Sequence, residues 1–111
     1  MSLIDKIPHA TVLDLRNEIP VEEEQVSSKT LVQRRDLGIT LISLDTDEAI
    51  GGHASPGDAL VNMLSGVAEI TIGESKHIVK GGEAIVLPAT VPHALYAIDA
   101  FQMLLTVVKP E

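Results

Sequence analysis

The sequence predicts an all-β fold, a sandwich or a barrel, and three observations support this prediction. Beyond Asp45, glycines and prolines interrupt the chain at near-even intervals, and the pieces between them have strand length. These pieces are rich in Val, Ile, Leu and Thr, which favour strands. No segment has the length and periodicity of an ordinary helix. Many short strands separated by glycine turns are typical of all-β sandwiches and barrels.

The spacing of the glycines and prolines predicts the positions of the strands. They cover residues 26–35, 39–44, 59–65, 67–72, 76–79, 84–87, 93–98 and 101–108, with a further edge strand over 11–15 after a loose arm. In 67–72 the even positions are apolar and the odd ones partly polar, which predicts one face toward water. The segment 101–108 is nearly apolar throughout, so we expect it to be covered on both faces.

Length and composition restrict the class of protein. A chain of 111 residues is expected to form one domain, spanning 1–111, that buries roughly 65% of its unfolded surface. The absence of cysteine excludes disulfides, thiolate nucleophiles and cysteine metal sites. No apolar run approaches ~20 residues and no signal peptide is visible, so we expect a cytoplasmic protein without a membrane partner. The net charge of -8 argues against nucleic acid as a partner.

Two segments each place a histidine at the mouth of a strand after a glycine turn. The first, 51–66, reads GGHASPGDALVNMLSG and contains His53, and the second, 82–93, reads GEAIVLPATVPH and ends at His93. These histidines are forty positions apart (93 minus 53), so local structure cannot bring them together. If they share a site, a folded sheet must create it.

The order of these features resembles that of the small single-domain cupins of the conserved-barrel type. The features are the histidine and proline loop, a strand ending in Leu-Ser-Gly, an Ile-Thr-Ile-Gly hairpin, Gly-x5-Pro and Val-Pro-His. The resemblance covers about 35–108 and implies a double-stranded β-helix, the jelly-roll barrel, whose two histidine motifs line one mouth. Residues 1–34 would then add an arm and extra strands. The resemblance and the acidic N-terminal third also imply a homodimer.

The chain departs from both cupin motifs. In the first motif Asp47 replaces a glycine, Ser55 a histidine and Ala59 the acidic ligand. In the second, Thr90 replaces a glycine and Ala97 an asparagine, while Gly82, Pro88 and His93 are retained. Metal-binding cupins usually offer three ligands from the first motif and one histidine from the second, so a metal here would rest on His53 and His93 alone.

Strand parity predicts which side chains enter the barrel. Positions 53, 55 and 59 share one face, whereas Asp58 faces away and is expected to bond the neighbouring loop backbone. Tyr96 should alternate outward, and His77 should lie on the surface, while His9 could fold over the mouth from the arm. The predicted pocket residues are His53, Ser55, Ala59, Met63, His93 and Leu95. Five apolar residues could either line a cavity or fill the core, namely Val61, Met63, Leu95, Phe101 and Met103.

Three interpretations of the histidine pair remain open. The pair can belong to a metal-free pocket for an organic ligand or water, to a divalent transition-metal site (Fe, Zn, Mn, Ni or Cu), or to metal-free acid–base chemistry. The missing ligands at Ser55 and Ala59 favour the binding of a small molecule. The alternative is a metal-dependent enzyme of the cupin dioxygenase or isomerase type, so the sequence leaves open whether the protein is an enzyme.

Overall fold

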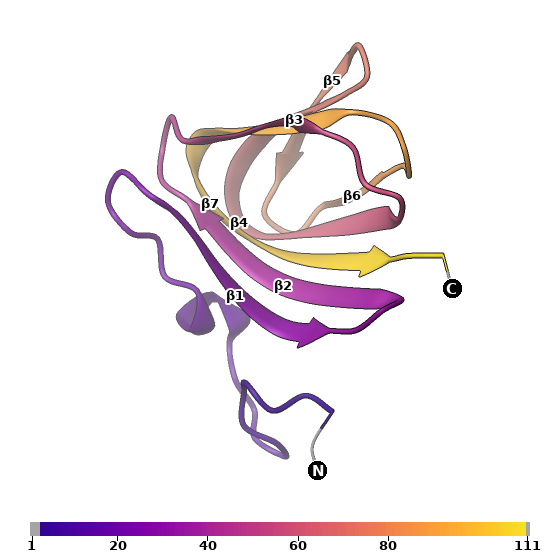
Figure 1. Ribbon diagram of the computed structural model, residues 1–111. Coiled ribbons are helices and arrows are strands. Elements are labelled where there is room, and N and C mark those ends of the chain that lie inside the picture. Colours follow the sequence, from indigo (N-terminus) through magenta and orange to yellow (C-terminus); the bar gives the residue numbers. More distant parts are fainter. Residues whose placement is uncertain (1–2, 111) are drawn as a thin grey trace.

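The computed structural model describes residues 3–110, and it is built almost entirely of antiparallel strands (Figure 1). The elements in chain order are the 3-10 helix η1 (Leu15–Glu18) and the strands β1 (Val26–Gln33), β2 (Leu37–Leu44), β3 (Ala49–His53), β4 (Asp58–Ile72), β5 (Ser75–Lys80), β6 (Ala84–Leu87) and β7 (His93–Val108). The all-β barrel expected from the turn spacing is therefore confirmed. No helix among residues 3–110 is long and apolar enough to cross a membrane.

The barrel is organised around β4 and β7, which pair with each other along most of their lengths. The first half of β4 pairs with the second half of β7, from Asp58 opposite Val108, and the pairing continues to Ile72 opposite His93. The remaining strands attach to this pair. The strand order is β1-β2-β7-β4-β5, with β3 on the first half of β7 and β6 on the first half of β4. In Figure 1 these strands curve around a common interior.

Two expected pairs of short strands are each one long, bent strand. The sequence predicted separate strands on either side of Gly66, but β4 runs through this residue, and β7 likewise joins 93–98 to 101–108. Gly66 has a φ of +82°, and the β4–β7 register shifts around it. A bulge bends a strand without ending it. The glycine that looked like a turn is therefore the point at which β4 bends around the barrel.

The strand β3 was missed because its glycines resembled turn residues. Gly51 and Gly52 both lie inside Ala49–His53, in a strand with a register shift between Ile50 and His53. Glycine within a strand often marks such an irregularity. The edge strand expected over 11–15 is also wrong. That stretch has no strand, and the chain there enters η1, which Asp14 caps by accepting a hydrogen bond from the Arg16 amide.

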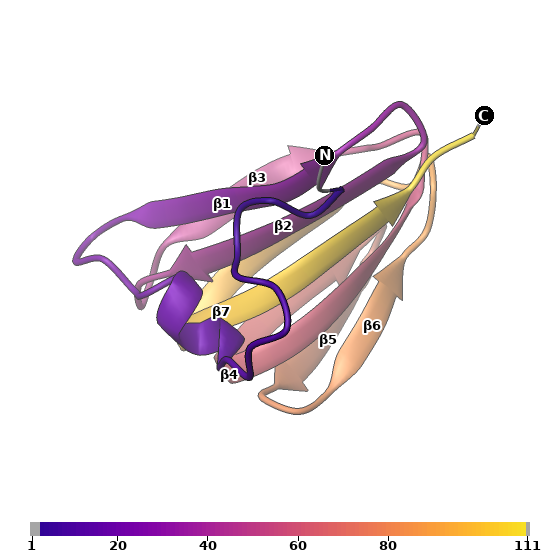
Figure 2. The ribbon, with the colours of Figure 1, turned by 90° about the horizontal axis from the view of Figure 1, so that it is seen from below.

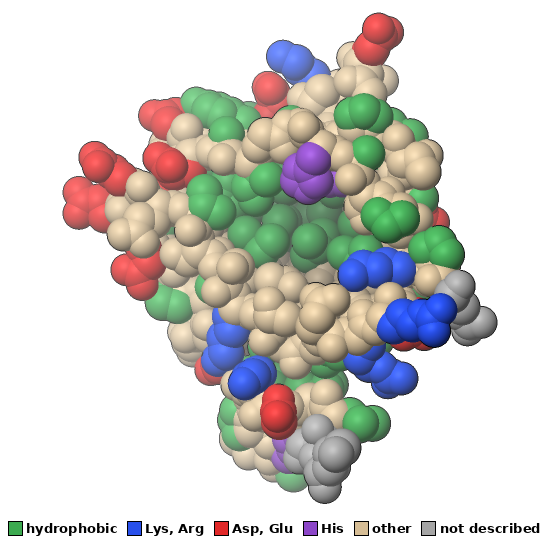
Figure 3. All heavy atoms as spheres, in the orientation of Figure 1, with side chains coloured by type: hydrophobic (Ala, Val, Ile, Leu, Met, Phe, Trp, Pro, Cys, Tyr) green, Lys and Arg blue, Asp and Glu red, His purple; other side chains and the backbone are tan. Residues whose placement is uncertain are grey.

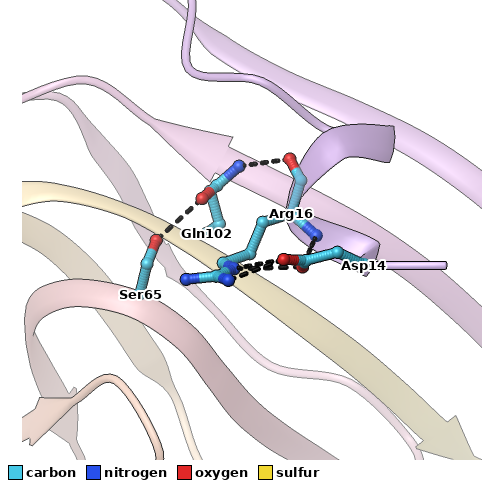
Figure 4. A network of polar contacts seen from close by, with 4 residues as sticks. All are labelled: Asp14, Arg16, Ser65 and Gln102. Carbon is cyan, nitrogen blue, oxygen red and sulfur yellow. Dashed lines mark hydrogen bonds and ion pairs between the residues drawn. The ribbon is translucent and has the colours of Figure 1, made fainter.

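The N-terminal segment crosses the outer face of the sheet formed by β2, β7 and β4 (Figure 2). It closes a second apolar cluster, formed by buried Ile19, Leu31, Val32 and Leu41 with Ile7, Leu15, Leu37, Ile39, Leu64 and Leu104 around them. Polar contacts fix its position (Figure 4). The Gln102 amide nitrogen on β7 donates to the carbonyls of Arg16 and Ile19 at 2.7 and 2.8 Å, and its oxygen accepts from Ser65.

The larger core fills the barrel and follows the predicted alternation. Ala68 and Ile70 are buried, while the odd positions beside them are only half-buried. In 101–108 both faces are covered, because Met103 packs in the barrel core and Leu104 against the outer cluster. The expectation for 67–72 rested on the two-residue period of a strand and that for 101–108 on its nearly continuous apolar composition, and both are confirmed.

The bend at Gly66 gives the first testable prediction. A Cβ at this position would collide with the Ala100 carbonyl oxygen and the Phe101 backbone, so Gly66→Ala should lower the free energy of unfolding by roughly 2–5 kcal/mol, from backbone strain and overpacking together. Gly82 also has a positive φ, of +90°, but has open space around it. Gly82→Ala should therefore cost only the backbone strain, roughly 1–2 kcal/mol. Denaturant unfolding followed by circular dichroism measures both, and equal losses would show that the close approach of β7 is not the cause.

Candidate functional site

The two motif histidines meet because β3 pairs with the start of β7. His53, the last residue of β3, lies directly opposite His93, the first residue of β7, and their ring centroids are 4.9 Å apart. Opposite residues of an antiparallel pair have Cβ atoms roughly 5 Å apart. The prediction that only a folded sheet could join these residues is therefore confirmed.

A cavity of about 270 Å³ opens beside the histidine pair. Its lining comes from several strands and consists of Ile42, Ile50, His53, Ser55, Ala59, Leu87, His93, Leu95, Met103, Leu105, Val107 and Lys109. Figure 3 shows this hollow with a green apolar floor and purple histidine atoms at its upper edge. His53 is exposed at the rim, whereas His93 is only 7% exposed.

Backbone carbonyls determine which nitrogen of each imidazole carries a proton. His53 Nδ1 lies 2.9 Å from the Gly51 carbonyl oxygen, and His93 Nδ1 lies 3.4 Å from that of Val91. A carbonyl oxygen can only accept, so in the neutral ring Nδ1 is the donor and Nε2 keeps its lone pair. The hydrogen bonds of both rings to the described residues are made through Nδ1 and not through Nε2. The pair therefore offers two acceptors at the cavity.

The structure places five of the six predicted pocket residues at this cavity, and one elsewhere. His53, Ser55, Ala59, His93 and Leu95 line it. Met63 does not, although it has inward parity. It is 1% exposed, packs in the barrel core and lies opposite Met103, which does reach the cavity. The odd or even position of a residue predicts which face of a strand its side chain is on, but not how far it lies from the mouth of the barrel. Met63 lies in the packed core below the cavity.

Several lining residues were not singled out from the sequence. Leu105 and Val107 share the inward face of β7 with Met103, so the alternation of that strand could have identified them. Ile42 on β2 and Leu87 on β6 reach the cavity only through tertiary packing. Lys109 follows the last strand and carried no signal in the sequence.

Two loops close the histidine side of the mouth. The Thr90 amide donates to the Ser55 carbonyl at 2.7 Å, and the Ala89 amide donates to Asp58 at 2.7 Å. The second contact confirms that Asp58 faces away from the pocket and bonds the neighbouring loop. These bonds tie the segment after β3 to the segment before β7 and so hold Ser55 at the cavity.

The backbone retains the left-handed conformation at both positions where a non-glycine residue replaces a motif glycine. Asp47 has a φ of +71° and Thr90 a φ of +67°. Aspartate tolerates this region better than a β-branched threonine. At Asp47 the side chain also accepts a hydrogen bond from the Tyr96 hydroxyl, which links the start of β3 to the outer face of β7. The outward direction expected of Tyr96 is thus confirmed.

The remaining two histidines lie outside the site. His77 is exposed on β5, as expected. His9 is exposed in the N-terminal arm, where its ring contacts the Ile4 carbonyl instead of covering the mouth. Among residues 3–110, no three His, Cys, Asp or Glu side chains come together as a metal site. Zinc sites generally use three or four protein ligands, so His53 and His93 do not by themselves fit a metal.

Sequence comparison now places this geometry in a family. The sequence model of the family described as the cupin domain matches residues 40–109. The chain belongs to the cupin family. This match contains both histidine segments and every strand from β3 onward. None of the curated proteins compared with the chain matches it.

Solved structures agree with this membership. A conserved protein of unknown function from Streptococcus pyogenes is 60% identical, with a TM-score of 0.98 over 100% of this chain and 97% of that one. A cupin superfamily protein from Desulfitobacterium hafniense is 28% identical, with a TM-score of 0.93 over 98% and 100%. A cupin 2 conserved barrel domain protein from Leptotrichia buccalis is 38% identical, with a TM-score of 0.85, and this chain spans 87% of itself but 47% of that protein.

The contact between Tyr96 and Asp47 gives a pH-dependent prediction. The hydrogen bond to the Asp47 carboxylate favours the protonated phenol, and the pKa of Tyr96 is therefore raised above its ordinary value of 10.0. Tyr96 is the sole tyrosine and the chain has no tryptophan, so the ultraviolet absorbance of phenolate reports this residue alone. Asp47→Asn should move its titration toward lower pH. The control Asp99→Asn removes a negative charge from an exposed position and should leave the pKa of Tyr96 unchanged. If Asp47→Asn also leaves the pKa of Tyr96 unchanged, the contact is contradicted.

Proposed function

We propose that this cupin binds a small, mostly aliphatic molecule in the barrel cavity, with a hydrogen-bond donor of the ligand, such as a hydroxyl, directed at His53 and His93. The observation that supports it is the composition of the lining: eight of its twelve residues are apolar, and the histidines form a compact polar group at the mouth. Pockets for small molecules typically combine apolar walls with a few placed polar groups.

The cavity volume limits the size of the ligand. A volume of about 270 Å³ equals that of about nine waters at the ~30 Å³ each occupies in the liquid. A ligand of roughly ten non-hydrogen atoms or fewer fits this space. Burial of its aliphatic part against Leu95, Met103 and Leu105 would supply most of the binding free energy, because apolar burial contributes roughly 25 cal/mol per Å².

The histidines favour a ligand that donates a hydrogen bond. Since each Nδ1 faces a carbonyl, the neutral imidazoles present Nε2 lone pairs, which accept hydrogen bonds but do not donate them. A ligand hydroxyl can donate to one of them. A wholly apolar ligand that displaced water from the Nε2 of the buried His93 would leave this acceptor unpaired, which is unfavourable.

A metal-dependent enzyme is the alternative function, and one observation favours it. Histidines that bind a metal through one ring nitrogen usually donate from the other to a carbonyl or carboxylate, and both His53 and His93 have a carbonyl at Nδ1. The number of metal-ligating side chains argues against this alternative. Ser55 and Ala59 line the same cavity but replace the ligands that would complete a site, since a neutral hydroxyl is a poor ligand and a methyl group is none.

Filling the cavity should weaken binding without unfolding the barrel. The Ala59 side chain lines the cavity, so in Ala59→Leu the added atoms enter the empty volume and should weaken binding of an aliphatic alcohol such as hexanol at least tenfold. In methyl NMR spectra of the unmodified protein, hexanol should shift the Met103 signal more than that of Met63, which lies outside the cavity lining.

The matched control is Ala84→Leu. Ala84 is exposed on β6, and β6 pairs with β4, the strand that contains Ala59. This variant should bind hexanol like the unmodified protein and should keep the same methyl shifts. If neither linear nor branched alcohols move the Met103 signal, or if Ala59→Leu binds as well as Ala84→Leu, the cavity is not the binding site that we propose.

A further inference from the structure

The cavity has an unusual charge for this chain. The protein carries sixteen Asp plus Glu against eight Lys plus Arg, yet its cavity lining contains no acidic residue and one lysine, Lys109. In the formal charge count, in which histidine is neutral, Lys109 is therefore the single charged residue of the lining. The local charge of the cavity is opposite in sign to that of the whole molecule.

The backbone of Lys109 is held in place at the mouth. Its amide donates to the Asp36 carbonyl at 2.9 Å, directly after the last residue of β7. Gly57, in the loop that carries Ser55, packs so closely that an added Cβ there would lie 3.1 Å from the Lys109 Cα. The ammonium group makes no ion pair with an acid in the part of the chain that the structure describes. Lys109 is thus fixed at its Cα, while its ammonium group has no acidic partner among residues 3–110.

We propose that the ligand carries a carboxylate that binds the Lys109 ammonium group, at the other end of an aliphatic chain whose hydroxyl faces the histidines. This inference rests on the proposed binding function and adds the class of ligand, a short hydroxy acid. A charge-assisted bond is stronger than a neutral one, and apolar walls screen it less than water does. The lack of acids in the lining removes the repulsion that a carboxylate would otherwise meet. A lysine serves here as a flexible point charge.

The experiment compares ligands that differ only at one end. The 111-residue chain is titrated by calorimetry with hydroxyalkanoates, with the corresponding diols and with the corresponding amino alcohols. Their chains have about four to six carbons to suit the volume. For at least one chain length, the acid should bind about tenfold more tightly than the diol, and the amino alcohol should bind more weakly than both. Raising the ionic strength should reduce the preference for the acid.

Two variants connect this preference to Lys109. Lys109→Gln should bring the acid to the affinity of the diol while the diol itself binds as before. Lys80→Gln removes the same charge from an exposed site on β5 and should retain the preference, which controls for net charge. The carboxylate proposal is overturned if no chain length favours the acid or if the preference survives Lys109→Gln. Binding of diols without a preference would leave the binding function intact, whereas a series in which nothing binds would overturn both proposals.

Discussion

The antiparallel pairing of β4 with β7 is the constraint on which the rest of the structure depends. These two strands pair from Asp58–Val108 to Ile72–His93, and each other strand except β1 pairs directly with one of them. Because β4 bends at Gly66, one continuous pair serves both halves of the barrel. The first half of β7 pairs with β3, and its second half pairs with β2. The inward side chains of this second half form the floor of the cavity.

The site follows from this arrangement. The β3–β7 register sets His53 against His93, and the carbonyls of Gly51 and Val91 orient the rings. The inward face of β7 then provides Leu95, Met103, Leu105 and Val107, and the chain leaves the strand at Lys109. This strand therefore contributes the buried histidine and half of the eight apolar lining residues, and the residue directly after it, Lys109, contributes the positive charge. This continuity explains how a small barrel presents apolar, accepting and cationic groups in one small cavity.

The sequence predicted the architecture well because strand parity and glycine spacing are local properties. They were sufficient to place His53, Ser55, Ala59 and Leu95 on inward faces and Asp58 and Tyr96 outward. They failed where the outcome depended on tertiary structure. Gly51 and Gly52 became strand residues only through pairing with β7, Gly66 became a bend because Ala100 and Phe101 pack against it, and Met63 had the right face at the wrong depth. Lys109 lines the cavity although it lies after the end of β7, where strand parity makes no prediction.

The central claim is that the histidine pair serves an organic ligand and not a metal ion, and metal content tests it most directly. Protein purified without chelator is equilibrated with iron, zinc, manganese, nickel or copper, and the metal per chain is measured after removal of excess. We expect no stoichiometric retention by the unmodified chain, and about one equivalent in the double variant Ser55→His, Ala59→Glu, which completes a four-ligand set. One equivalent retained by the unmodified chain and lost in His93→Ala would contradict the account.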